Sequence, residues 1–171
     1  SRRFTSPEQV AVSPDGANVY VTGVTGDSIA VYARDQSSGD LTHMETVRNG
    51  SSYGCVNTLQ VNQPSAGPIC SSLSGMDGAY GIAFSPGGEH VYVTTKYSST
   101  VMVFGRQTSG AETGSLEYPS PSILRTAFLQ RYTNTLLSAA YGVAVSPDGA
   151  NVYVTGYTSD ALITLDRDAS N

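Results

Sequence analysis

One segment of this chain occurs twice without a single difference. Residues 10–23 read VAVSPDGANVYVTG, and residues 143–156 repeat them letter for letter. A diverged copy, IAFSPGGEHVYVTT, occupies residues 82–95 between them. Because internal self-similarity is the sequence signature of repeat architectures, one structural unit is expected to occur three times along the 171 residues.

Each copy of the repeat predicts a β-hairpin. The runs at residues 10–12 and 19–22 are rich in valine, with tyrosine and threonine, which is typical of strands. A Ser-Pro-Asp-Gly turn at residues 13–16 joins them, because proline presets φ and the final glycine tolerates a positive φ. A third strand at residues 29–32 and a fourth at residues 41–47 complete an antiparallel unit.

Four-stranded antiparallel units that recur along a chain are typical of β-propeller blades. An immunoglobulin-like sandwich is the rival all-β fold, but it would not repeat its sequence internally. The predicted fold class is therefore all-β, a single segment with about 2.75 blades of an incomplete propeller. Its expected parts are blade 1 (about 9–47), a cysteine-containing connection (48–78), blade 2 (about 79–122), a second connection (123–139) and a partial blade 3 (about 140–171).

The second connection carries apolar side chains at every fourth position, namely Leu124, Phe128, Tyr132 and Leu136. This spacing predicts a short helix, and an irregular loop is the alternative that the sequence leaves open. After it, the third copy of the repeat ends without a fourth strand. Another segment is therefore expected to pair beside residues 162–165.

The residues of the repeat form a specific pattern: VYVTG follows SPDG, and DSIAVYARD and SGDLT come next. This pattern resembles the lactonase-like, YVTN-type β-propeller repeats over residues 10–47, 80 to about 118, and 141–168. Members of that family include sugar-lactone hydrolases and many bacterial or cell-surface proteins with no known activity. The resemblance implies the propeller fold, whereas a function has to be argued from a site.

Cys55 and Cys70 are the two cysteines of the chain, in a segment rich in Ser, Gly, Asn and Pro. A disulfide between them is predicted, with two free thiols as the alternative, because no His or third Cys stands at metal-ligand spacing. A disulfide implies an oxidising compartment. Asn49-Gly50-Ser51 is an acceptor sequence for N-glycosylation, so an extracellular or cell-surface protein glycosylated at Asn49 is predicted.

Propeller enzymes place polar groups where the innermost strands begin, beside the central channel. Here those positions hold Glu8, Tyr80 and Tyr141. One carboxylate and two tyrosines make neither an acid–base pair nor a metal cage, so no catalytic or metal-binding residue is predicted. Glu8 as a lactonase-type ligand competes with Glu8 as a solvated strand residue. Tyr97 and Tyr157, in equivalent loops, are candidates for stacking on sugar rings or docking a protein, with packing on the rim as the other outcome.

The charged and imidazole side chains that accompany the repeat are predicted to be structural. Asp15 and Asp148 suit the turn, and Gly87 replaces them in the second copy, which argues against a calcium site. His90, in a turn position, and His43, on a rim strand, are expected at the surface. An arginine ends the third strand of every copy and is expected to bond to neighbouring turns or carboxylates between blades. These arginines are Arg34, Arg106 and Arg167.

Composition excludes several classes of function. The net charge is −5 and the basic residues are scattered, so no nucleic acid partner is expected. No apolar stretch approaches the ~18 residues of a membrane span, and no glycine-rich phosphate loop or other cofactor motif is present. The sequence favours an extracellular structural or interaction module, held by other blades of the same chain or by neighbouring copies, with a glycan or another protein as further partners. The alternatives are a lactonase-like hydrolase whose active site lies mostly outside this chain, and a carbohydrate-binding propeller.

Overall fold

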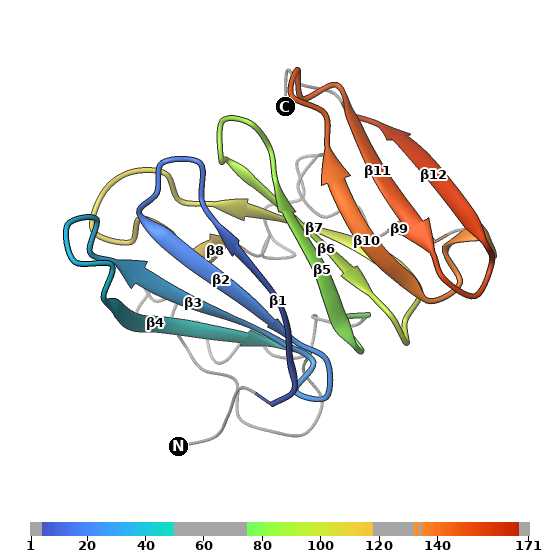
Figure 1. Cartoon of the computed structure of the whole chain (residues 1–171), viewed down its shortest axis with the longest axis horizontal. Coiled ribbons are helices and arrows are strands. Elements are labelled where there is room, and N and C mark those ends of the chain that lie inside the picture. Colours follow the sequence, from blue (N-terminus) through green and yellow to red (C-terminus); the bar gives the residue numbers. More distant parts are fainter. Residues whose placement is uncertain (1–4, 50–74, 118–131, 134, 168–171) are drawn as a thin grey trace, which may run out of the picture.

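Three antiparallel sheets follow one another along the chain, and a computed structural model places them side by side (Figure 1). The structure describes residues 5–49, 75–117, 132–133 and 135–167. Within these residues the fold is all-β apart from a short 3₁₀ helix, as the repeat predicts. None of their helical residues forms a segment long and apolar enough to cross a membrane.

The first blade is a meander in which each strand pairs with the next. Its strands are β1 (Pro7–Val12), β2 (Asn18–Gly23), β3 (Ser28–Arg34) and β4 (Leu41–Arg48), in that order across the sheet. β1 is the innermost strand, next to the second blade, and β4 lies at the outer edge (Figure 1). The four-stranded antiparallel meander that the repeat predicts is therefore confirmed in this sheet.

The third blade repeats the geometry of the first. Its strands are β10 (Ala140–Val145), β11 (Asn151–Gly156) and β12 (Ala161–Asp166). Val143 faces Val154 across the hairpin, as the equivalent Val10 and Val21 do, and both innermost strands carry the same register shift near their start. Among the described residues β12 pairs only with β11, so the segment expected beside it stays a prediction.

In the second blade, two separate short strands pair with the outer edge of the third strand of the sheet. β5 (Ala79–Phe84), β6 (His90–Thr95) and β7 (Thr100–Arg106) form the meander. β8 (Leu116–Glu117) pairs with the end of β7, and β9 (Tyr132–Thr133) pairs with its beginning.

The second connection contains a short strand, whereas the sequence left a short helix or an irregular loop open. Tyr132 lies in β9 and Leu136 in the 3₁₀ helix η1 (Thr135–Leu137). A helical stripe through these positions is therefore wrong, because the backbone of Tyr132 is hydrogen-bonded to β7 instead. Leu124 and Phe128 lie outside the described residues.

The Ser-Pro-Asp-Gly turns fold as their sequence predicts. Gly16 has φ +70° and Gly149 has φ +74°, a region that a Cβ disfavours. Asp15 accepts hydrogen bonds from the Ser13 hydroxyl and the Ala17 amide, and Asp148 accepts the same pair in the third blade. The turn role predicted for both aspartates is confirmed.

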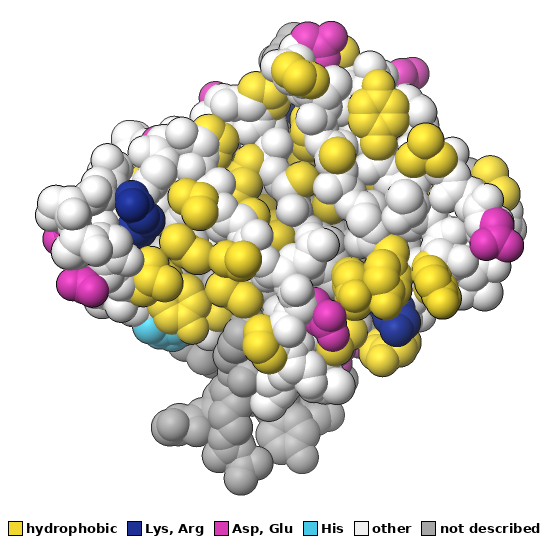
Figure 2. Space-filling model, viewed as in Figure 1, with side chains coloured by type: hydrophobic (Ala, Val, Ile, Leu, Met, Phe, Trp, Pro, Cys, Tyr) yellow, Lys and Arg dark blue, Asp and Glu magenta, His cyan; other side chains and the backbone are white. Residues whose placement is uncertain are grey.

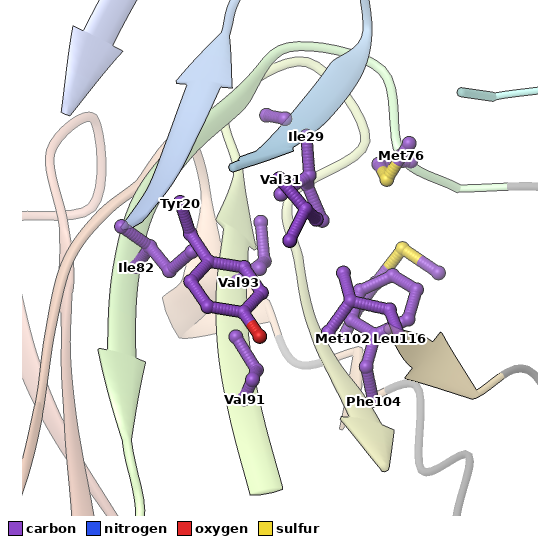
Figure 3. Close-up of a cluster of buried hydrophobic side chains, with 11 residues drawn as sticks. Tyr20, Ile29, Val31, Met76, Ile82, Val91, Val93, Met102, Phe104 and Leu116 are labelled. Carbon is purple, nitrogen blue, oxygen red and sulfur yellow. The ribbon is translucent and has the colours of Figure 1, made fainter. Parts of the chain in front are cut away.

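Two clusters of buried side chains lie between neighbouring blades. Figure 3 shows the first, in which Tyr20, Ile29 and Val31 of the first blade meet the face of the second. The other cluster fills the space between the second and third blades. Every residue of β6 and β7 is consequently buried, whereas β11 alternates between buried and less buried positions. The blades stabilise one another by covering each other's faces.

Arg106 crosses the first interface, as predicted for the repeated arginines. Its Nη2 lies 2.7 Å from Asp15 Oδ2 and 2.8 Å from Asn18 Oδ1, and its Nε donates to the Tyr20 hydroxyl at 2.9 Å. Although partial burial raises the pKa of Asp15, hydrogen bonds from Ser13 and Arg106 prevail and lower it from 3.8 to about 2. The carboxylate is thereby held ionised against the guanidinium.

His90 is buried, which corrects the expectation of a surface position. It begins β6, is 8% exposed, and lies between the second blade and Arg167 of the third. Its Nδ1 accepts a hydrogen bond from Arg167 Nη2 at 3.1 Å, so the ring is neutral with its proton on Nε2. Burial first, and then the charge of Arg167, lower the pKa of His90 below its usual 6.5. The turn position alone did not reveal that the next blade would cover it.

Replacing His90 with asparagine, the residue at the equivalent positions 18 and 151, is expected to flatten the pH dependence of stability. In the native chain the unfolded state binds a proton at His90 more readily than the folded state, so the free energy of unfolding falls as pH drops below 6.5. Urea unfolding at pH values from about 7.5 to 5 measures this slope. An unchanged slope in His90→Asn would contradict the burial; the exposed His43 serves as an internal control, because it stays in both proteins.

Candidate functional site

Four tyrosines and a lysine gather at the end of the second and third blades where β5 and β10 begin. The innermost strands start at this end, and the loops after β6 and β11 return to it because the strands are antiparallel. We call this group the tyrosine patch. It consists of Tyr80, Lys96, Tyr97, Tyr141 and Tyr157.

The rings of the tyrosine patch are in contact with one another. The centroids of Tyr80 and Tyr141 lie 3.9 Å apart with a tilt of 34°, and Tyr157 stacks on Tyr141 at 5.2 Å and 28°. The Lys96 ammonium is 5.3 Å from the Tyr141 centroid and 5.8 Å from that of Tyr97. These are cation–π distances, so Lys96 joins the tyrosines of the two blades into one surface.

Much of this surface is open to solvent. Tyr97 is 64% exposed and Tyr157 is 69% exposed, although exposed aromatic rings are costly to hydrate. Figure 2 shows hydrophobic side chains gathered beside basic and acidic groups near the ends where β5 and β10 begin. Aromatic faces, phenolic hydroxyls and an ammonium are thus presented together.

Glu8 lies at the same end, on β1 of the first blade. The pKa of Tyr80 is raised by its hydrogen bond with Tyr141, then by burial, and then by the negative charge of Glu8. At neutral pH the Tyr80 phenol is therefore protonated, and it can donate a hydrogen bond but not act as a nucleophile. Among the described residues, no group of three His, Cys, Asp or Glu side chains could hold a metal ion.

The predicted ligand residues Tyr97 and Tyr157 belong to the tyrosine patch, and their role as ligands stays a prediction. Asn49 donates from its side-chain amide to the Asp77 carboxylate between the first two blades, so a glycan on that nitrogen would have to replace this bond. Glycosylation and the extracellular location stay predictions. Cys55 and Cys70 lie outside the described residues, and so does any disulfide between them.

Sequence reasoning missed the contacts that make the patch. Tyr80 and Tyr141 share one position of the repeat, and Lys96 and Tyr157 share another, two residues after the repeated threonine of the second strand. The tyrosines and the lysine at these two equivalent positions were the signal that the sequence offered. It did not reveal that neighbouring blades would bring the side chains within contact distance.

Comparison with known proteins bears on the repeat directly. Residues 2–58 match the family model described as "Lactonase, 7-bladed beta-propeller". This match covers the first copy of the repeat, which resembles the lactonase-like propeller type. Lactonase-like repeats therefore account for the spacing of SPDG turns and VYVTG strands, and the resemblance expected from the sequence is confirmed.

Solved propellers superimpose on nearly the whole chain. A candidate 6-phosphogluconolactonase of Bacteroides fragilis matches with a TM-score of 0.68 at 14% identity over 99% of this chain and 37% of its own. The periplasmic gluconolactonase PpgL of Pseudomonas aeruginosa matches with a TM-score of 0.67 at 20% identity, over 98% of this chain and 37% of its own. The Cps50 (Swd1) propeller domain of Myceliophthora thermophila matches with a TM-score of 0.57 at 12% identity, over 95% of this chain and 41% of its own.

These likenesses establish the fold and no more, because the identities are low and the Cps50 domain carries no lactonase name. The chain spans 37–40% of the length of the first four solved structures. No curated protein matches it.

Proposed function

We propose that this chain supplies three neighbouring blades of a lactonase-like propeller, and that the tyrosine patch binds the ring of a sugar lactone for hydrolysis. The observation that carries the proposal is the meeting of Tyr80, Tyr141 and Tyr157 with Lys96 at the start of the innermost strands. The lactonase family match at residues 2–58 and the gluconolactonase names of two solved relatives supply the substrate class.

The chemistry of the patch suits a hydroxylated ring whose hydrolysis yields an acid. The exposed ring of Tyr157 offers an apolar face of the kind that stacks on the C–H face of a sugar. The protonated Tyr80 phenol can donate to a ring or hydroxyl oxygen. Lys96 supplies positive charge where the carboxylate of the product forms. In this proposal the groups that activate water come from outside the described residues, and Glu8 is an acidic side chain beside Tyr80 at the same end of the blades.

Tyr157→Ala is expected to weaken binding of δ-gluconolactone and gluconate by about fivefold, since removing one stacked aromatic contact costs on the order of 1 kcal/mol. Isothermal titration of the 171-residue chain with each compound measures the dissociation constants. Because Tyr157 is 69% exposed, the substitution leaves the fold intact.

Leu41→Ala provides the matched control, an exposed apolar side chain on β4 of the first blade, away from the patch. Equal affinities for Tyr157→Ala, Leu41→Ala and the unchanged chain would contradict the assignment of the patch. A chain that binds neither compound, and does not accelerate lactone opening in a pH-stat, would favour the structural module that the sequence first suggested.

A further inference from the structure

Lys96 is the only lysine of the chain, and it lies in the tyrosine patch. It directly follows β6, and its backbone amide donates to the Gly78 carbonyl at 2.8 Å. This bond fixes the point at which the side chain leaves the second blade. The ammonium group then lies between the ring of Tyr97, from its own blade, and the ring of Tyr141, from the third.

The ammonium group of Lys96 has aromatic partners and no anionic one. Among the described residues no carboxylate pairs with its Nζ, and no hydrogen bond to that atom is formed. The guanidinium of Arg106, in contrast, meets the Asp15 carboxylate at 2.7 Å. An aromatic face attracts a cation without neutralising its charge. Lys96 is only partly buried, so its N–H donors can reach an anion that arrives from solvent.

The rings on both sides of Lys96 are themselves held in place. Tyr97 packs on the backbone of Gly78, where an added Cβ would lie 2.7 Å from the Cδ2 atom of the ring. Tyr141 lies between the rings of Tyr80 and Tyr157. The lysine side chain is therefore confined before a ligand binds, which lowers the entropy that binding has to offset.

The charges of the patch are separated along its ring pair. Glu8 lies beside Tyr80, and its negative charge contributes to the raised pKa of that phenol. Lys96 contacts Tyr141, the other member of the pair. A carboxylate on a bound molecule is attracted to the ammonium and repelled by Glu8. The patch therefore favours one orientation of a sugar acid, with its carboxylate at Lys96.

We propose that Lys96 makes the tyrosine patch bind an open sugar acid more tightly than an uncharged sugar derivative, so that the acid formed from a lactone inhibits its own formation. The inference rests on the proposed function. In that reaction water adds to the lactone carbonyl, the bond from the carbonyl carbon to the ring oxygen breaks, and the ring oxygen leaves as a hydroxyl. The acid then releases a proton at neutral pH. Lys96 thus faces a neutral carbonyl in the substrate and a carboxylate in the product.

Two ligands that differ in charge and share their hydroxyl groups test the proposal. These are gluconate and gluconamide, titrated calorimetrically into the 171-residue chain. Gluconate is expected to bind about fivefold more tightly, the upper range for a solvent-exposed ion pair. Raising sodium chloride from about 0.02 M to about 0.5 M should remove most of this preference, because salt screens exposed charges.

Lys96→Met is expected to bring the ratio of the two affinities close to one, whereas Lys96→Arg keeps the charge and should keep most of the preference. Arg34→Met is the matched control, since it removes the same charge where Arg34 Nη1 donates to the Gly16 carbonyl, at the opposite end of the first blade. It should leave the ratio unchanged. Circular dichroism confirms that each variant keeps its strands.

The single lysine also allows a test without substitution. Saturating gluconate should slow the acetylation of Lys96 by N-hydroxysuccinimide acetate, followed by mass spectrometry of the peptide that contains it. Equal affinities of the unchanged chain for the two ligands, a ratio unaffected by Lys96→Met, or an acetylation rate unaffected by gluconate would each overturn the inference. Binding of δ-gluconolactone would still support the proposed function in those cases. A chain that binds none of the three compounds would overturn both.

Discussion

Replacing Arg106 with methionine is expected to lower the free energy of unfolding by about 3 kcal/mol, the lower end of the cost of removing one partner of a buried ion pair. The side chain of Arg106 is 1% exposed and donates to Asp15, Asn18 and Tyr20 across the interface between the first two blades. Methionine fills the space of the alkyl stem but leaves the Asn18 and Tyr20 oxygens without a donor. Asp15, with 41% of its side chain exposed, regains water and moderates the loss.

Urea unfolding measures the change. Arg106→Lys keeps the charge but not the fork of donors, so about half of the loss should remain. Glu112→Ala should leave the midpoint unchanged. A loss below about 0.5 kcal/mol for Arg106→Met, the range of ordinary surface substitutions, would contradict the role of this arginine in joining the blades.

Local sequence predicted the parts of the fold that local chemistry determines. The Ser-Pro-Asp-Gly turns, the strand pairs and the order of strands in each meander follow from residues within one copy of the repeat. The third strand of each copy ends in an arginine. This recurrence also indicated a contact with the turns, because a side chain that recurs in every blade is expected to have a structural role there. Arg106 and Arg167 confirm that reasoning.

Burial between blades could not be predicted in this way. The sequence VAVSPDGANVYVTG is identical in the first and third blades, yet Tyr20 is buried and Tyr153 is exposed. The difference lies in what packs against the sheet, which the repeat itself does not encode. His90 was misplaced for the same reason, and β9 was missed because a two-residue strand carries no periodicity.

The four tyrosines of the patch were singled out in the sequence, whereas Lys96 and the geometry of the patch were not. The equivalent loops of Tyr97 and Tyr157 made them candidates for binding, with packing on the rim as the alternative, and the structure shows both rings exposed. The stack of Tyr80, Tyr141 and Tyr157 depends on the angle and spacing between two blades. No short motif records that angle, so only the three-dimensional arrangement shows that the rings meet.

Gly81→Ala is expected to lower the free energy of unfolding by about 2 kcal/mol, the cost of forcing a methyl group into a filled space. A Cβ at Gly81 would collide with the backbone carbonyl of Tyr141 in the third blade and lie 2.6 Å from Thr94 Oγ1. That hydroxyl accepts from the Gly81 amide at 2.7 Å and donates to the Tyr141 carbonyl. The added methyl therefore pushes the second and third blades apart and breaks the hydrogen bonds that join them.

Gly142→Ala tests the same residue change at the equivalent position of the third blade. There the amide donates to Thr155 Oγ1 at 2.8 Å, and a Cβ would meet only that threonine, at 3.1 Å. In the 171-residue chain its cost should stay below about 1 kcal/mol, because among the described residues no carbonyl of another blade lies within 4 Å of that Cβ. Gln9 holds this position in the first blade, so the crowding belongs to the contact between β5 and β10 and not to the repeat. Equal losses for the two glycine variants in thermal or urea unfolding would refute this explanation and place the cost within the hairpin.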